Sequence, residues 1–324
     1  MGPIIRLSRR GVLAGAASLS ACAPRTSKPS DVTLRVGSYK GGAQTLFAAA
    51  GLTDTPYQVR YSELGAGNLI GEAINARALD VGSMSEIPPI FVAGKASLLR
   101  LVAVQRGDVN AQVTLVPASS PIRSPADLKG KRIGFVKATT AQYFLLRMLE
   151  QQGLTFADIE PIALSPQDGL AAFGRGALDA WVIYGVQGSI ARGRLGARVL
   201  TTGLGRLSGN YVYAALKDSL DDPPKRGAIV DYLRRTQRAY AWAEKNPDAW
   251  AAAQSAASGV PAAIYLQQHR ERSAPTVLAP VDEAAIASEQ TVADAFAKAG
   301  VIPAAVDVRP LWTTILNEPL FKKT

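Results

Sequence analysis

The sequence predicts an α/β protein of two lobes, each a mostly parallel β-sheet flanked by helices. Three observations support this prediction. The chain has 324 residues, more than one hydrophobic core usually organises. Strand-like segments alternate with helix-like segments, as is typical of parallel sheets. The same order of segments occurs twice along the chain, about 99 residues apart.

The composition is that of a folded chain with a basic excess. Hydrophobic residues make up 48% and charged residues 19%, without a biased tract. The formal charge is +10, and residues 22–324 alone contain 33 basic and 26 acidic side chains. This excess favours anionic partners. The Lys and Arg residues are scattered, however, with no basic run interleaved with aromatic residues, so we expect no nucleic-acid binding.

One cysteine and one histidine limit the possible chemistry. Cys22 has no partner for an internal disulfide, and His269 alone cannot build a zinc cluster. We therefore expect no metal and no cofactor. His269 lies in a polar helical stretch, and we expect it to be solvated.

Residues 1–22 have the pattern of an export signal. Arg9 and Arg10 precede a short apolar run that cannot span a bilayer. Residues 8–13 resemble the twin-arginine export pattern, although any secretory signal carries a basic region. Leu19-Ser20-Ala21-Cys22 resembles a bacterial lipobox, in which the cysteine becomes lipidated after cleavage. We expect a lipid anchor on Cys22, a flexible tether over residues 23–30, and a location in the periplasm or on the outer face of the cell membrane.

The body begins with a strand, a glycine turn and a helix. Residues 32–37 alternate like a strand, Gly41 and Gly42 follow, and residues 43–50 predict a helix. Leu34-Arg35-Val36 recurs as Ile133-Gly134-Phe135, and Leu79-Asp80 as Leu178-Asp179, both 99 positions later. The chain therefore repeats one layout, unless these short identities are a coincidence.

Turn and cap signals predict the domain boundaries. Residues 124–133 predict a turn, one helical turn and a strand, which suits entry into a second lobe. We expect the crossovers near 116–123 and near 203–213. The first lobe would then comprise 31–118 and 210–324, the second 119–209, and the tail helices 229–244, 248–258 and 283–300 would pack mainly on the first lobe.

Several segments resemble periplasmic solute-binding proteins of ABC importers, most closely those for aliphatic sulfonates, taurine and nitrate. The segments are Asp127-Leu128-Lys129-Gly130-Lys131 with Thr139-Thr140, Gly82 to Phe91, Gly176 to Trp181, and Val292 to Phe296 with Gly300 to Pro303. The resemblance covers residues 32–310. It implies the type II periplasmic-binding-protein fold.

The same resemblance implies a function and partners. The chain would be an extracytoplasmic, monomeric lipoprotein that captures a small anionic or zwitterionic ligand, such as an alkanesulfonate or taurine, between two closing lobes. It would deliver this ligand to a permease whose ATPase is a separate chain. Nitrate, a thiamine-precursor pyrimidine, riboflavin and an aromatic acid remain alternative ligands, because the wider family binds them.

Ligands of open α/β sheets bind beyond the carboxyl ends of the strands. There, helix N-termini near residues 41–44 and 139–142 would hold an anion through backbone N–H groups. The threonines could instead act only as helix caps. Trp181 could equally belong to the core, and Glu86 indicates a zwitterion or a polar heterocycle. The candidate ligand contacts are Gly42, Gln44, Ser83, Ser85, Glu86, Thr139, Thr140, Gln142, Trp181 and Tyr184.

An enzyme and a sensory module are the competing classes. A desulfinase of this fold uses a cysteine nucleophile, but the only cysteine here lies in the export signal. No serine with a partner histidine can be proposed in the body either. We therefore expect a binding protein and no catalytic residue, while a sensory binding module remains open.

Overall fold

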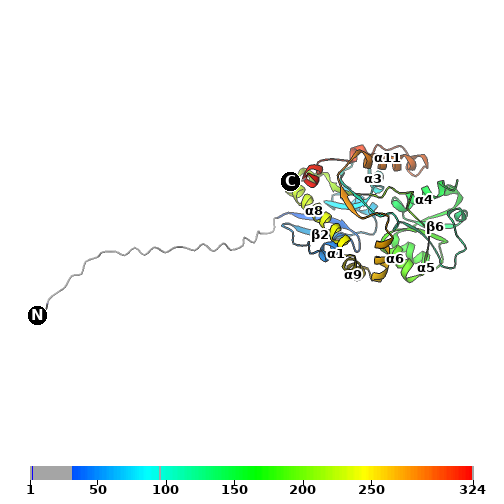
Figure 1. Cartoon of the computed structure of the whole chain (residues 1–324). Coiled ribbons are helices and arrows are strands. Elements are labelled where there is room, and N and C mark those ends of the chain that lie inside the picture. Colours follow the sequence, from blue (N-terminus) through cyan, green and yellow to red (C-terminus); the bar gives the residue numbers. More distant parts are fainter. Residues whose placement is uncertain (1, 3–30, 95, 323–324) are drawn as a thin grey trace.

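The computed structural model describes residues 2, 31–94 and 96–322. Apart from Gly2, the expected export signal with Cys22 and the expected tether lie outside these residues. The described chain forms two lobes, each around its own β-sheet (Figure 1). The two-lobed α/β fold is therefore confirmed.

The first sheet has six strands. They lie in the order β11-β4-β10-β3-β1-β2. β1 pairs in parallel with β2 and β3, whereas β10 and β11 pair antiparallel with their neighbours. The strands are β1 (Thr33–Ser38), β2 (Gln58–Glu63), β3 (Val81–Ser85), β4 (Leu99–Arg106), β10 (Asn210–Leu216) and β11 (Val277–Ala279).

The second sheet has five strands, in the order β7-β6-β8-β5-β9. β6 pairs in parallel with β7 and β8, and β5 pairs antiparallel with β8 and β9. The strands are β5 (Val113–Val116), β6 (Arg132–Phe135), β7 (Glu160–Ala163), β8 (Ala180–Ile183) and β9 (Arg198–Thr202).

Both sheets are mixed, and most strands of each sheet run in one direction, as predicted: β1 to β4 in the first sheet and β6 to β9 in the second. The strands that run against the others are β11 and β10 in the first sheet and β5 in the second, and of these β5 and β10 enter their sheet directly from the other lobe. Such a strand follows no crossover helix on its own sheet, and helical crossovers are what impose the parallel direction.

The first crossover lies earlier than the sequence predicts. The chain leaves β4 and enters the second sheet through residues 107–112, because β5 already pairs with β8 and β9. The expected crossover at 116–123 is therefore wrong, as is the lobe boundary at residue 118. All four residues of β5 are buried, and a short apolar run does not reveal which sheet it joins. The return passage runs through residues 203–209, between β9 and β10.

The internal repeat corresponds to a repeated ion pair. In the first lobe Asp80 N–H donates to Arg35 O, and in the second Asp179 N–H donates to Arg132 O. Each aspartate also accepts hydrogen bonds from its arginine's backbone and side chain. The strand offset between the lobes is thus 97 positions rather than 99, since Arg35 corresponds to Arg132.

Helices cover the faces of both sheets. α2, α3 and α11 pack on one face of the first sheet and α1 and α8 on the other, while α4 and α5 cover the second. The helices are α1 (Ala43–Ala49), α2 (Gly67–Asn75), α3 (Pro88–Val92), α4 (Thr140–Glu150), α5 (Pro166–Gly174), α6 (Gly185–Arg194), α7 (Lys217–Asp221), α8 (Pro223–Lys245), α9 (Pro247–Ser258), α10 (Ala262–Glu271), α11 (Glu283–Lys298) and α12 (Asn317–Phe321).

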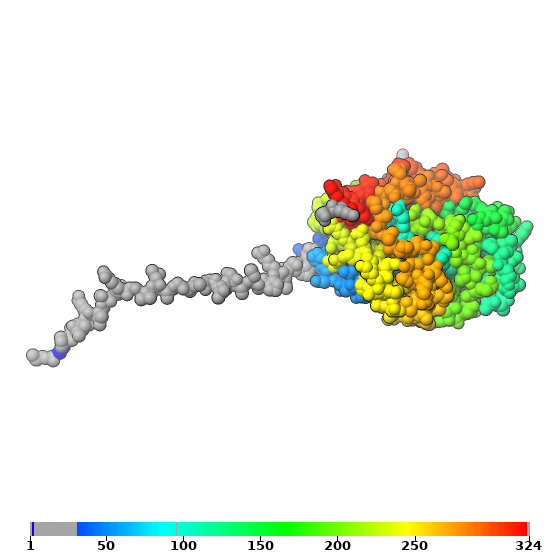
Figure 2. Space-filling model, in the orientation of Figure 1, coloured from blue at the N-terminus to red at the C-terminus, as the bar shows by residue number. Residues whose placement is uncertain are grey.

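The tail does not pack only on the first lobe. α9 packs on α1 of the first lobe, and α10 packs on α9 and reaches α6 of the second lobe. In the space-filling view the yellow and orange surface of these helices lies against the green surface of the second lobe (Figure 2). The chain thus joins the lobes at α10 as well as at the two crossovers.

Within the described residues, no helix is long and apolar enough to cross a membrane. Residues 31–94 and 96–322 also contain no group of three or more His, Cys, Asp or Glu side chains placed to hold a metal ion.

Candidate ligand-binding site

A cavity of about 620 Å³ lies between the lobes. The first lobe contributes the segments that follow β1 and β3, and the second lobe contributes the starts of α4 and α6. Residues of α8, α9 and α10 form a third wall. This is the position that the topology of open α/β sheets predicts for a ligand.

Several helices begin at the cavity, and α1 is one of them, because Gly42 and Ala43 line it. Gly65 and Gly67 at the start of α2, Thr139 and Thr140 at the start of α4, and Gly185 at the start of α6 all line it. α2 and α6 have no side-chain cap on their N-terminal N–H groups. Such groups carry partial positive charge and bind anions.

Thr139 is the N-cap of α4. Its hydroxyl donates to Val136 O at 2.8 Å and accepts from Ala141 N at 3.3 Å. The hydroxyl proton is therefore already used inside the protein. The capping alternative thus describes Thr139, whereas its neighbour Thr140 also lines the cavity.

The Tyr184 ring lines the cavity at the start of α6. Its hydroxyl is shielded from solvent and has no hydrogen-bond partner among the described residues. Burial raises the pKa of Tyr184 to about 12, partly opposed by the Thr139 hydroxyl. The phenol is therefore protonated at neutral pH and keeps an unused donor beside the cavity.

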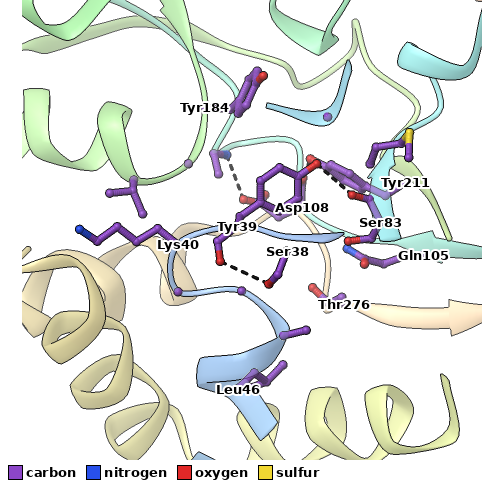
Figure 3. A pocket seen from close by; sticks show the side chains of 18 of the residues that line it. Ser38, Tyr39, Lys40, Leu46, Ser83, Gln105, Asp108, Tyr184, Tyr211 and Thr276 are labelled. Carbon is purple, nitrogen blue, oxygen red and sulfur yellow. Dashed lines mark hydrogen bonds between the residues drawn. The ribbon is translucent and has the colours of Figure 1, made fainter. Parts of the chain in front are cut away.

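Tyr39, which the sequence analysis did not single out, shapes the first-lobe side. Its hydroxyl donates to Ser83 O at 2.9 Å (Figure 3). Its own carbonyl accepts from Gly42 N at 2.8 Å. A Cβ on Gly42 would lie 2.7 Å from the Ser38 hydroxyl, so this tight turn requires glycine. Gly42, Ser83 and Ser85, three of the candidate ligand contacts, line the cavity.

A second set of cavity residues that the sequence did not predict lies at the crossovers. Gln112 Nε2 donates to the Tyr211 hydroxyl at 2.8 Å, and both residues line the cavity. Gln112 Oε1 is buried without a partner among the described residues. Asp108, also at the cavity, accepts hydrogen bonds from Ala111 N at 2.9 Å and Ser273 N at 2.8 Å. No sequence pattern marks these residues, because their proximity depends on how the crossovers pack.

Four expected ligand contacts lie outside the cavity lining. Gln44 is exposed on α1. Gln142 is buried, and its Oε1 accepts from Ala138 N at 2.7 Å, which closes the turn before α4. Trp181 is fully buried, and its ring lies 5.8 Å from that of Phe173. The core alternative is thus correct for Trp181, since β8 is buried on both faces.

Glu86 is the fourth of these residues. It is buried behind the cavity, where its carboxylate accepts from Ser208 at 2.5 Å, Ser288 at 3.1 Å and Asn210 at 3.3 Å. Burial raises the pKa of Glu86, and these three hydrogen bonds oppose the rise. The residue joins β3 to the return crossover and to α11. Glu86 therefore gives no indication of a zwitterionic or heterocyclic ligand.

His269 is not a solvated surface residue. It is half-buried, lines the cavity, and its ring lies 5.6 Å from that of Trp250. Burial lowers the pKa of His269, and Arg272 lowers it further. The polar residues around His269 favoured a solvated side chain. The prediction is wrong because one face of α10 is turned inward against α9.

The chain is similar to known proteins over most of its length. The model of the family described as NMT1/THI5 like matches residues 72–250. A protein of Escherichia coli (strain K12), named as an aliphatic sulfonates-binding protein, is 33% identical over 314 residues, which is 95% of this chain and 96% of that protein.

Two solved structures are similar over most of their length. The periplasmic aliphatic sulphonate binding protein SsuA from Escherichia coli has a TM-score of 0.73 and 31% identity, covering 86% of this chain and 90% of that one. The alkanesulfonate-binding protein SsuA from Xanthomonas axonopodis pv. citri, bound to MOPS, has a TM-score of 0.78 and 29% identity, covering 87% and 98%.

Proposed function

We propose that this chain, which belongs to the NMT1/THI5-like family, is the periplasmic solute-binding protein of an ABC importer and that its ligand is a sulfonate. The similar proteins named above are sulfonate-binding proteins, and their lengths agree with that of this chain. The permease and the ATPase would be separate chains. We further propose that the binding protein is a monomer.

The observation that carries the proposal is the convergence of three helix N-termini on one cavity. α2 and α6 have no side-chain cap, so their first N–H groups remain available for the oxygens of an anion. A sulfonate offers three such oxygens on one sulfur atom. We propose that Gly67, Thr140 and Gly185 contribute backbone donors and that the Tyr184 hydroxyl completes the set.

Two carboxylates at the cavity, those of Asp108 and Glu244, are already engaged by other groups of the protein. Asp108 holds the first crossover together, and Glu244 accepts from Arg272 Nη2. Lys40 also lines the cavity and adds a positive charge. Glu63 lines the cavity too, so the proposed donors for the anion are the helix N-termini rather than a net positive charge.

Lobe closure would couple ligand binding to delivery. The two crossovers, residues 107–112 and 203–209, are the only backbone connections between the sheets among the described residues. They can act as a hinge, so that the anion is held by first-lobe and second-lobe donors only in the closed form. The closed form would then present one combined surface to the permease.

An enzymatic role has little support from the residues. The only cysteine is Cys22, which precedes the described body, so a cysteine nucleophile is not available beside the cavity. The relatives above are binding proteins rather than enzymes. We therefore propose binding without turnover.

Isothermal titration calorimetry of the purified protein tests the ligand. Ethanesulfonate should bind with a single site, while nitrate, a pyrimidine, riboflavin and benzoate should bind more weakly. If one of those four binds more tightly than every sulfonate tested, the ligand assignment is wrong. Chemical consumption of the ligand would instead establish an enzyme.

Export and anchoring are separate proposals. We propose that Cys22 is lipidated and that residues 9 and 10 direct twin-arginine export. The Cys22→Ser variant should move from the membrane fraction to the soluble periplasm. Replacement of both Arg9 and Arg10 by Lys should block export by the twin-arginine route, whereas unchanged export would indicate the general secretory route.

A further inference from the structure

The cavity is much larger than a sulfonate headgroup requires. Its volume of about 620 Å³ lies within the range of about 300–1,000 Å³ that is typical of sites for drug-sized ligands. A sulfonate with only two carbons would fill a small part of it. The side chains of the remaining wall therefore indicate which chemical group is attached to the sulfonate.

That wall is aromatic. Trp250 of α9 and Tyr265 of α10 line the cavity, with ring centroids 5.9 Å apart and planes at 79°. His269, one turn further along α10, places its ring 5.6 Å from Trp250. Tyr240 of α8 lines the cavity as well, and its hydroxyl donates to Gln105 Oε1 at 2.6 Å. We call Tyr240, Trp250, Tyr265 and His269 the ring wall.

The ring wall carries little net charge. Burial lowers the pKa of His269, so its imidazole is neutral at pH 7. Glu244, which lines the cavity beside it, is ion-paired with Arg272. An ammonium group at the ring wall would therefore find its neighbouring carboxylate already paired, while Glu63 and Asp108 line the cavity outside the ring wall. An uncharged ring, by contrast, gains edge-to-face and offset contacts with the aromatic side chains.

We propose that the ring wall is a subsite for an uncharged planar ring, so that the preferred ligands are arylsulfonates rather than taurine or open-chain alkanesulfonates. This inference depends on the proposed sulfonate function and narrows it. The helix N-termini hold the sulfonate, and the ring wall selects the group attached to it. Trp250 and His269 are then specificity-determining residues for that group.

Three sulfonates separate the two proposals. Ethanesulfonate tests the headgroup site alone, whereas benzenesulfonate and hexanesulfonate have six carbons each and differ in planarity. We expect benzenesulfonate to bind at least about fivefold more tightly than hexanesulfonate, as measured by calorimetry on the purified protein. Equal or tighter binding of hexanesulfonate overturns the ring wall while the sulfonate function stands. Failure of all three to bind overturns the sulfonate function itself.

Variants locate the preference. Trp250→Leu should reduce the ratio of hexanesulfonate to benzenesulfonate dissociation constants toward one. The matched control is Trp242→Leu, since Trp242 is half-buried against the first-lobe core and does not line the cavity; it should keep the wild-type ratio. His269→Ala is the second variant, and it should also lower the ratio. It provides the test if circular dichroism shows that Trp250→Leu does not fold. An unchanged ratio in a folded ring-wall variant contradicts the proposal.

Discussion

The Arg35 guanidinium holds the Asp80 carboxylate through two hydrogen bonds, at 2.9 Å from Nε and at 2.7 Å from Nη2. Ser219 and Lys225 donate to the same carboxylate, whose side chain is fully buried. In the second lobe Arg132 and Asp179 repeat the pair, but both side chains are about one-third exposed. One ion pair therefore occurs in two environments within a single molecule.

This difference predicts unequal costs of removing the two carboxylates. Asp80→Asn should lower the free energy of unfolding by about 3 kcal/mol, because it leaves the half-buried Arg35 and Lys225 without the buried carboxylate that they share. Asp179→Asn should cost clearly less, because water screens an exposed pair. Urea denaturation at pH 7 measures both values, and equal losses would contradict the argument.

The same pair predicts a pH dependence. Burial opposes ionisation of Asp80, but the hydrogen bonds from Arg35, Ser219 and Lys225 outweigh it and hold the pKa well below its usual value of about 4. A carboxyl with a lowered folded pKa stabilises the protein above its unfolded pKa, and this contribution is lost as the pH falls. The stability gap between wild type and Asp80→Asn should thus shrink from pH 6 to pH 3. A constant gap would show that the charge is not responsible.

Tyr184→Phe should separate affinity from stability. The hydroxyl has no partner among the described residues, so its removal should leave the unfolding midpoint unchanged or slightly raised. Sulfonate affinity should fall about tenfold, the usual loss for one hydrogen bond to a charged group. Tyr57→Phe is the control. The Tyr57 hydroxyl donates to Asp231 Oδ2 at 2.9 Å, and neither residue lines the cavity. Undiminished affinity in Tyr184→Phe would remove Tyr184 from the set of sulfonate donors.

Gln268 predicts an effect on ligand release. Its Nε2 donates to the Ser189 hydroxyl of α6 at 2.9 Å, which joins the tail to the second lobe. Gln268→Ala should raise the dissociation rate several-fold while the association rate changes less, since a contact that holds the tail against the second lobe is lost. Its neighbour Gln267 bonds only Glu271 on the same helix, at 2.8 Å, so Gln267→Ala is the matched control. Stopped-flow release measurements decide, and identical rates for both variants would exclude a contact that slows opening.

Two glycines in helices predict opposite stability changes. A Cβ on Gly169 of α5 would lie 2.6 Å from Trp181 Nε1, so Gly169→Ala should destabilise the second lobe by about 1–3 kcal/mol. Gly227 of α8 has open space at its Cβ position, so Gly227→Ala should stabilise the protein by about 0.5–1 kcal/mol. Thermal unfolding checks both signs. A tolerated Gly169→Ala would mean that the Trp181 ring can shift.

Local signals made much of the fold predictable. Ser124 and Asp127 form a capping box where the sequence predicts one helical turn before β6, and Thr139 caps α4 where a helix start was expected. Pro247 separates α8 from α9 close to the predicted boundary. These features depend on residues within one helical turn of one another, so their spacing is visible in the chain itself.

The sequence by itself determined the α/β class, the two repeated units, the approximate bounds of α1, α9 and α11, and the turn residues that begin the site, including Gly42 and Thr139. Only the tertiary structure decided that β5 joins the second sheet, that Trp181 and Glu86 are buried away from the cavity, and that Tyr39 and His269 line it. The physical reason is range. Caps and turns are set by hydrogen bonds between near neighbours, whereas the sheet that a strand joins and the face that a side chain presents depend on pairing and packing between segments far apart in the chain.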